Sequence, residues 1–237
     1  TSTGSRSAAM NTSPPLWRRA FAELLGTGLL VAVVVGSGIA AQRLSPNDTG
    51  LALLENAIAT AFGLAVLIVV FQPLSGAHFN PVVTLVNRTL GDRATATELV
   101  TYVAAQLVGA CGGAVLANAM FATPTAIATT DRTDAGRLLG EVVATAGLVL
   151  LIFALARSDR ARIVGPVVGA YIGAAYWFTS STSFANPAVT VGRAFTDSFA
   201  GIAPGSAAWF VVAQLLGGIV GLGLVLLLFP SPRKDLA

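Results

Sequence analysis

Two short stretches, far apart in the chain, carry nearly the same residues between long apolar segments. The first reads Gly-Ala-His-Phe-Asn-Pro-Val-Val-Thr-Leu over residues 76–85, and the second reads Ser-Phe-Ala-Asn-Pro-Ala-Val-Thr-Val-Gly-Arg over 183–193. Each copy predicts a helix start, because Asn is a preferred N-cap and Pro suits the first helical position. Between apolar segments, a polar helix start must be buried in protein or line a water-filled cavity. The pattern therefore predicts two short helices that enter a membrane without crossing it.

The composition places the chain in the membrane. It is 54% hydrophobic and only 11% charged, with a mean hydropathy of +0.76, whereas a soluble domain carries about 25% charged residues. Its basic residues form no patch with interleaved aromatics, so a nucleic-acid partner is not expected. One His, the lone Cys111 and no paired catalytic carboxylates offer little chemistry. We therefore expect neither an enzyme nor a bound metal or cofactor.

The apolar segments predict an all-α integral membrane protein with six transmembrane helices and two re-entrant half-helices. A span needs about 20 residues to cross the hydrocarbon core, which the half-helices, at 80–90 and 186–195, lack. The expected spans cover 17–41, 51–71, 97–120, 137–156, 163–178 and 206–229.

The chain is internally repeated. Residues 103–110 resemble 211–218, Glu23 matches Glu141, and each Asn-Pro copy follows the second span of its half. Three spans per half is an odd number, so the halves lie in opposite orientations as an inverted 3+3 repeat, with a site expected at the midplane. We divide the chain into a disordered N-terminal tail (1–15), a first repeat (16–121), an extracellular linker (122–136), a second repeat (137–230) and a cytoplasmic tail (231–237).

The distribution of Lys and Arg predicts the orientation, because cytoplasmic loops of membrane proteins carry an excess of these residues. Both termini are expected in the cytoplasm. Inner segments then hold Arg6, Arg18, Arg19, Arg88, Arg93, Arg157, Arg160, Arg162, Arg233 and Lys234, and outer segments hold Arg43, Arg132, Arg137 and Arg193.

Together, the two Asn-Pro motifs, the paired glutamates and the repeat resemble the aquaporin, or major intrinsic protein, family over about residues 17–229. The resemblance implies a bundle of six tilted helices plus two half-helices, with a pore in each monomer. It also implies a homotetramer in the inner cell membrane whose partners are lipid and small neutral solutes. Val82 replaces the usual Ala of the first motif, and this larger side chain is expected to narrow or dry the pore centre slightly.

The pore centre is expected to comprise both motifs, Asn80-Pro81-Val82 and Asn186-Pro187-Ala188. Each Asn side-chain oxygen would cap its own helix, leaving the amide group to donate to passing solutes. Both helix N-termini, the positive ends of their dipoles, would point at the centre. A cation or proton would meet an electrostatic barrier there, and a neutral molecule would not.

Three further residues are candidates for lining the pore or supporting its loops. Glu23 and Glu141 are acids at membrane depth, which makes them functional candidates. The resemblance favours carboxylates that accept hydrogen bonds from the re-entrant loops over a proton relay. His78 either lines or gates the pore, or packs its loop. Solute flux through wild type and His78→Ala across the pH range in which His changes charge would separate these roles.

The outer filter departs from the family pattern. Most members carry Arg three positions after the second Asn, and here that position is Val189. Counting back from Asn186 assigns two further filter positions to Ser183 and Ala174. The remaining position falls on Thr60 by spacing from Asn80 or on Phe62 by local similarity. Arg193, one turn beyond Val189, is either a charge at the outer mouth or a loop anchor.

Ala, Ser and Val at these positions predict a wide filter with few donors. The function expected is a passive channel for water and small uncharged solutes that admits larger ones, such as arsenous acid or related metalloids. An ordinary water-selective aquaporin or a glycerol facilitator is the alternative. An ion-coupled secondary transporter is less favoured, because few acids beyond Glu23 and Glu141 lie at membrane depth.

Overall fold

A computed structural model describes residues 14–91 and 95–230, and these residues form helices and connecting loops. Within these residues, each half of the chain contains four α-helices, of which the third is a short half-helix. The first half comprises α1 (Leu16–Leu44), α2 (Thr49–Ser75), α3 (Pro81–Thr89) and α4 (Ala96–Met120). The second comprises α5 (Ala135–Arg157), the 3₁₀ turn η1 (Ala161–Ile163), α6 (Val164–Phe178), α7 (Pro187–Gly192), the 3₁₀ turn η2 (Arg193–Phe195) and α8 (Pro204–Leu228). Residues 1–13 and 231–237, which hold nearly all of both predicted tails, lie outside the described residues.

The six predicted spans correspond to α1, α2, α4, α5, α6 and α8. Five of them, all except α6, are long and apolar enough to cross a membrane. α6 has only 15 residues, and η1 extends it at its start. The half-helices α3 and α7 have nine and six residues, too short to span. The chain is thus a multi-pass membrane protein with the predicted helical fold.

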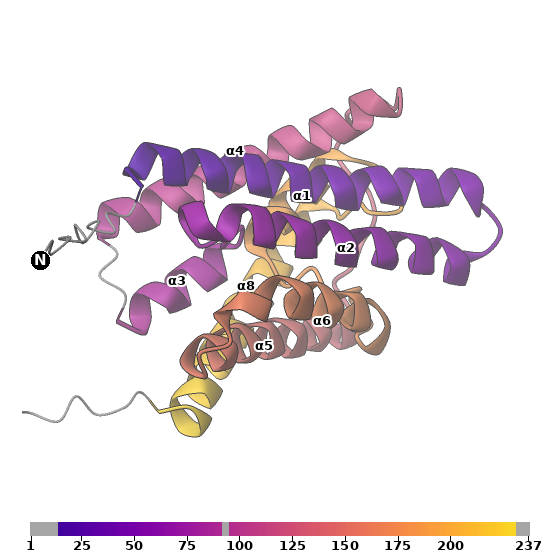
Figure 1. Ribbon diagram of the computed structural model, residues 1–237. Helices are drawn as coiled ribbons and strands as arrows, with labels where there is room; N and C mark the ends of the chain where they lie inside the picture. Colours follow the sequence, from indigo (N-terminus) through magenta and orange to yellow (C-terminus); the bar gives the residue numbers. More distant parts are fainter. Residues whose placement is uncertain (1–13, 92–94, 231–237) are drawn as a thin grey trace, which may run out of the picture.

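The helices lie side by side in a bundle, with α1 antiparallel to α2 and packed against α4 (Figure 1). Glycines allow close approach between helices, as is common in membrane bundles. A Cβ atom added to Gly113 of α4 would lie 2.1 Å from the carbonyl oxygen of Gly28 in α1. In the second half, a Cβ on Gly221 of α8 would lie 2.7 Å from the carbonyl oxygen of Ala146 in α5. In both halves, therefore, a glycine lets the first and the last long helix pack closely together.

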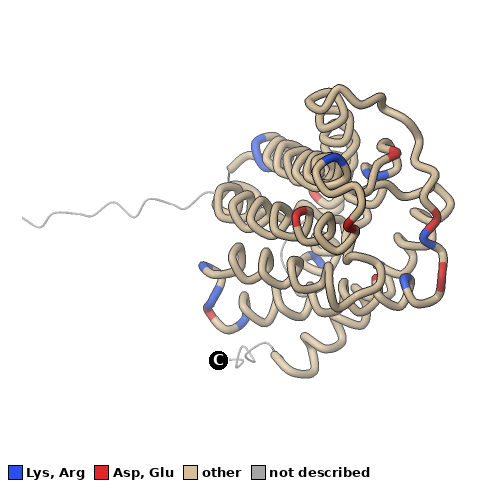
Figure 2. Tube along the Cα trace, turned by 90° about the vertical axis from the view of Figure 1, so that its right-hand side faces the viewer, with Lys and Arg blue, Asp and Glu red and all other residues tan. Residues whose placement is uncertain are grey.

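Most of the bundle carries no charge, and Lys, Arg, Asp and Glu are confined to a few short segments (Figure 2). We call the end of the bundle at which α1 begins the α3 end; there Arg19 of α1 pairs with Glu98 of α4. We call the opposite end, which holds the α1–α2 turn, the α7 end. There the loop 121–134 pairs with the segment after α7, as in the bond from the Ala128 amide to the Ala194 carbonyl oxygen.

Candidate functional site

The two half-helices begin at the middle of the bundle, and their caps are joined to each other. Asn80 accepts from the Val82 amide through its side-chain oxygen, and Asn186 does the same for the Ala188 amide. Each Asn amide nitrogen then reaches the opposite loop. The Asn80 side chain donates to the Ala185 carbonyl oxygen and that of Asn186 to the Phe79 carbonyl oxygen, both at 2.7 Å. This reciprocal pair holds the two helix N-termini face to face.

A single carboxylate organises the loop before α3. Glu23 is fully buried, and its two oxygens accept from the backbone amides of His78 and Phe79. They also accept from the Ser75 hydroxyl and from Gln106 of α4. These four hydrogen-bond donors stabilise the buried carboxylate, because a buried charge needs polar partners. Glu23 therefore supports the loop.

The loop before α7 repeats this arrangement. Glu141 accepts from the backbone amides of Phe184 and Ala185 and from Gln214 of α8. Both loops contain non-glycine residues in the left-handed region, with φ of 49° at Phe79 and 47° at Ala185. Such backbone is costly and persists only where neighbours impose it. The two glutamates supply that constraint through the amides they bind.

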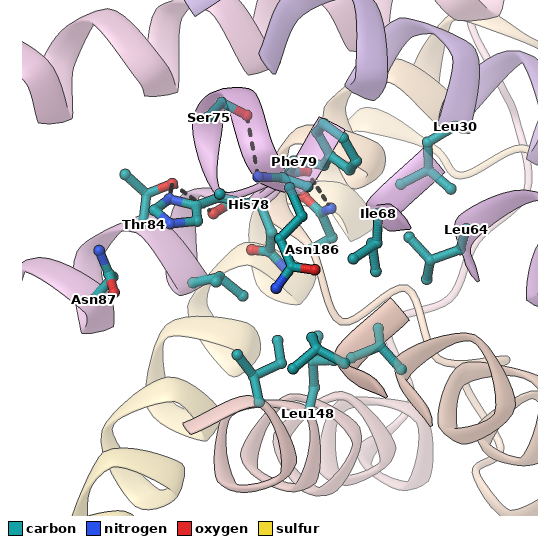
Figure 3. Close-up of a pocket in the computed structure, with 18 of the residues that line it drawn as sticks. Leu30, Leu64, Ile68, Ser75, His78, Phe79, Thr84, Asn87, Leu148 and Asn186 are labelled. Atoms are coloured by element: carbon teal, nitrogen blue, oxygen red, sulfur yellow. Dashed lines mark hydrogen bonds between the residues drawn. The ribbon is translucent and has the colours of Figure 1, made fainter. Parts of the chain in front are cut away.

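A cavity of about 740 Å³ runs along the half-helix junction. It extends from Arg19 and Glu98 at the α3 end, past Asn80 and Asn186, to Arg193 near the α7 end. In Figure 3, Asn186 lies at the centre of this space with Leu148 on the opposite wall, and Leu64 and Ile68 complete an apolar side. The cavity therefore has a polar wall formed by the loops and an apolar wall formed by the long helices.

The lining of the cavity near the α7 end excludes two of the filter assignments, Phe62 and Ala174. Thr60, Ser183 and Val189 line the cavity, whereas Phe62 is 71% exposed on the outside of the bundle. Ala174 is also exposed and does not line the cavity, so its assignment to the filter is wrong. Tyr176 lines the cavity instead, and its hydroxyl lies 3.1 Å from that of Thr60.

The reason for both corrections is helical geometry. The cavity-lining residues of α6 are Val164, Val168, Ile172 and Tyr176, and those of α2 include Thr60, Leu64 and Ile68. Each series repeats every four residues, which keeps it on one face. Ala174 and Phe62 lie two residues from a lining position, about 200° around the helix. They therefore point away from the cavity.

The first motif differs from expectation in the role of Val82. Its side chain is 1% exposed and does not line the cavity, so it does not narrow the pore centre. It packs instead against Gly218 of α8, where an added Cβ would lie 2.5 Å from Val82 Cγ1. Pro81, Pro187 and Ala188 are likewise absent from the cavity lining, so within the two motifs only the asparagines face the space.

Three cavity residues were either missed by the sequence analysis or left with an open role. Tyr176 was missed, although the four-residue apolar repeat of α6 carries the signal. Arg193 had two possible roles and combines features of both, because its Nε donates to the Ala200 carbonyl oxygen while the residue lines the cavity. His78 also lines the cavity, with Nδ1 3.2 Å from the Thr84 hydroxyl, and its gating role stays a prediction.

The site has the architecture of a channel, because two capped half-helices meet beside a continuous cavity. Residues 10–183 match the family model described as "Major intrinsic protein". The chain belongs to the major intrinsic protein family, whose members are passive channels and not enzymes.

The relatives agree with this membership. The chain is 50% identical over 219 residues to "Aquaglyceroporin AqpS" of Rhizobium meliloti (strain 1021), covering 92% of this chain and 93% of that protein. It is 32% identical to human "Aquaporin-2" over 240 residues, covering 93% and 82% of the two chains. The X-ray structure of the aquaglyceroporin from Plasmodium falciparum superposes with a TM-score of 0.65 at 21% identity, covering 89% of this chain and 96% of that one. The last comparison supports the fold alone.

Proposed function

We propose that this channel for water and small solutes has a filter that also admits larger neutral hydroxylated solutes, with arsenous acid as the specific candidate. The observation that carries this proposal is Val189, which gives the filter an uncharged side chain one turn after Asn186. A valine side chain is shorter than an arginine side chain and carries no hydrated charge. A bulkier neutral molecule therefore meets less obstruction in this filter.

The rest of the filter supplies both polar and apolar contacts. The hydroxyls of Thr60 and Tyr176 line one side, and Val189 lines another. A hydroxyl group both donates and accepts hydrogen bonds, so these residues replace some of the water lost by a hydroxylated solute. Arsenous acid and glycerol are both uncharged molecules with three hydroxyl groups. The relative named as an aquaglyceroporin supports this class of solute.

Tyr176 changes the comparison with the alternative. An aromatic wall in place of the expected Ala174 makes the filter narrower than Ala, Ser and Val alone predict, and this favours a glycerol facilitator over an unrestricted pore. A strictly water-selective channel is disfavoured by Val189. The ion-coupled transporter is disfavoured because Glu23 and Glu141 have their oxygens occupied by loop and glutamine donors.

Further features of the proposal concern its setting. We place the chain in the inner membrane with both termini in the cytoplasm, so that the α3 end faces the cytoplasm. The excess of Lys and Arg on the segments at that end favours this orientation. The division into a first repeat, a linker and a second repeat and the homotetramer also stay proposals. Asn80 and Asn186 are assigned as the solute contacts of the pore centre.

The test is the substitution Val189→Arg, measured by solute entry into proteoliposomes. The variant is expected to slow arsenous acid and glycerol entry more than water entry, because a long charged side chain takes up space in the filter. Ala174→Ser, on the exposed face of α6, serves as the matched control variant. Unchanged entry of the larger solutes in Val189→Arg would refute the wide filter.

A further inference from the structure

We propose that Arg193 is the charge-selecting residue of the α7 end: its guanidinium faces the pore one turn beyond Val189, repels cations and donates hydrogen bonds to oxygen-bearing solutes. This inference deepens the proposed function, on which it rests for the passage of neutral solutes through this cavity. Arg193 follows α7 directly, and its backbone amide donates to the Val189 carbonyl oxygen. Both side chains line the same cavity.

The guanidinium is buried yet keeps donors available. Arg193 is only 2% exposed, and Nε donates to the Ala200 carbonyl oxygen. Within the described residues, neither terminal nitrogen donates a hydrogen bond to the protein, and neither is a fully buried atom. Because the residue lines the cavity, we infer that the small accessible surface of these two nitrogens faces it. They are the donors that a passing solute meets.

The charge also lacks a direct counter-ion. In the described part of the chain, ion pairs join Arg19 to Glu98 and Arg137 to Asp134, and none involves Arg193. A buried charge is normally paired, so an unpaired guanidinium beside a solute path indicates a functional use. Glu141 contributes only a longer-range attraction. A positive potential therefore remains at this end of the cavity.

A second arginine reinforces that potential. The Phe184 ring has Arg193 Cζ at 3.4 Å from its centroid and Arg132 Cζ at 5.4 Å. Arg132 lies in the loop before α5, where burial lowers its pKa to about 10, so it stays protonated at neutral pH. Its side chain donates to the Gly201 and Phe199 carbonyl oxygens. Two positive charges thus share one aromatic ring at the α7 end.

The position of Arg193 is set in advance by its surroundings. The Phe184 ring packs on Phe210 of α8, with centroids 5.1 Å apart, and the Phe184 amide is held by Glu141. Cation–π contact with this ring and the Nε bond to Ala200 fix two sides of the guanidinium. A donor held in place contacts a solute at less entropic cost than a flexible one.

The experiment uses the full chain in proteoliposomes and measures potassium and proton leak together with glycerol entry. Arg193→Gln is expected to raise cation leak at least tenfold, which corresponds to about 1.4 kcal/mol, and to alter the glycerol-to-water ratio. Arg193→Lys keeps the charge and should keep the leak low. Arg137→Gln is the matched control, because that arginine lies at the same end but is paired with Asp134 and does not line the cavity.

The double variant Val189→Arg/Arg193→Gln separates charge from loop support. If Arg193 acts through its charge, an arginine one turn earlier restores the low leak even though the bond to Ala200 is gone. Equal cation leak in Arg193→Gln and wild type would overturn the proposal. It would also be overturned if Arg193→Lys and the double variant leaked cations as fast as Arg193→Gln does. Absence of glycerol and water entry in wild type would instead overturn the proposed function, and the two failures are read from different measurements.

Discussion

Val82 of α3 packs against Gly218 of α8, and a Cβ atom added to that glycine would lie 2.5 Å from Val82 Cγ1. In the internal repeat, the matching residues are Ala188 in the second Asn-Pro motif and Ala110 in α4. One contact between the two halves thus pairs a large residue with a glycine, whereas the two positions related to them by the repeat both hold alanine. This exchange of volume accounts for the unusual Val of the first motif without any effect on the pore.

Gly218→Ala is therefore expected to destabilise the protein by about 1–3 kcal/mol, because the new methyl group overpacks the contact with Val82. Val82→Ala in the same chain should recover part of this loss, since it removes the clashing methyl groups. Thermal unfolding in detergent of the wild type, the two single variants and the double variant measures the coupling between the two substitutions. Additive effects of the two substitutions would contradict the contact, and a changed water permeability in Val82→Ala would contradict its place outside the cavity lining.

Glu23→Ala and Glu141→Ala should each abolish solute entry and lower stability by several kcal/mol. Each leaves two loop amides and a glutamine side chain without their acceptor, and an unsatisfied buried donor costs about 1–3 kcal/mol. Glu55→Gln is the control, because among the described residues Glu55 accepts a hydrogen bond from the Ser45 hydroxyl alone. Unfolding temperature and flux are measured together, and a glutamate variant with normal flux would exclude loop support.

Tyr176→Ala is expected to raise glycerol entry several-fold relative to water, because it removes the aromatic wall that lines the filter beside Thr60. Ala174→Val, two residues away on the exposed face of α6, should leave the ratio unchanged. The rates of glycerol entry and of water entry, each measured by stopped-flow light scattering, give the ratio directly. The opposite ranking of the two variants would return the filter position to Ala174.

The loop at the α7 end is expected to loosen in acid. Hydrogen bonds from the Ser206 and Thr133 hydroxyls hold the pKa of Asp131 at about 2, below its ordinary value of 3.8. Because the folded-state pKa is lowered, the stabilisation is full above about pH 4 and is lost as pH falls through about 2. Hydrogen exchange of residues 128–134 should accelerate across this window in wild type. Asp131→Asn should show no such change with pH, and parallel profiles would exclude Asp131 as the cause.

Much of the fold follows from the sequence because its signals are local. Long apolar runs set the spans to within a few residues, and Asn before Pro marks the start of both half-helices. The roles of Val82 and Ala174 do not follow, because they depend on which neighbour a side chain meets. Counting back from Asn186 presumes a loop length, whereas the four-residue series ending at Tyr176 depends only on helix geometry. For filter residues, periodicity within a helix was the better guide than distance from a motif.

The most direct test of the proposed solute class is stopped-flow light scattering on proteoliposomes of the wild-type chain, comparing water, glycerol and arsenous acid with protein-free vesicles. A filter with Val189 in place of arginine predicts that all three enter faster than in protein-free vesicles. Entry of water alone would contradict the proposal, because it would mean that Tyr176 and Arg193 together close the filter to anything larger.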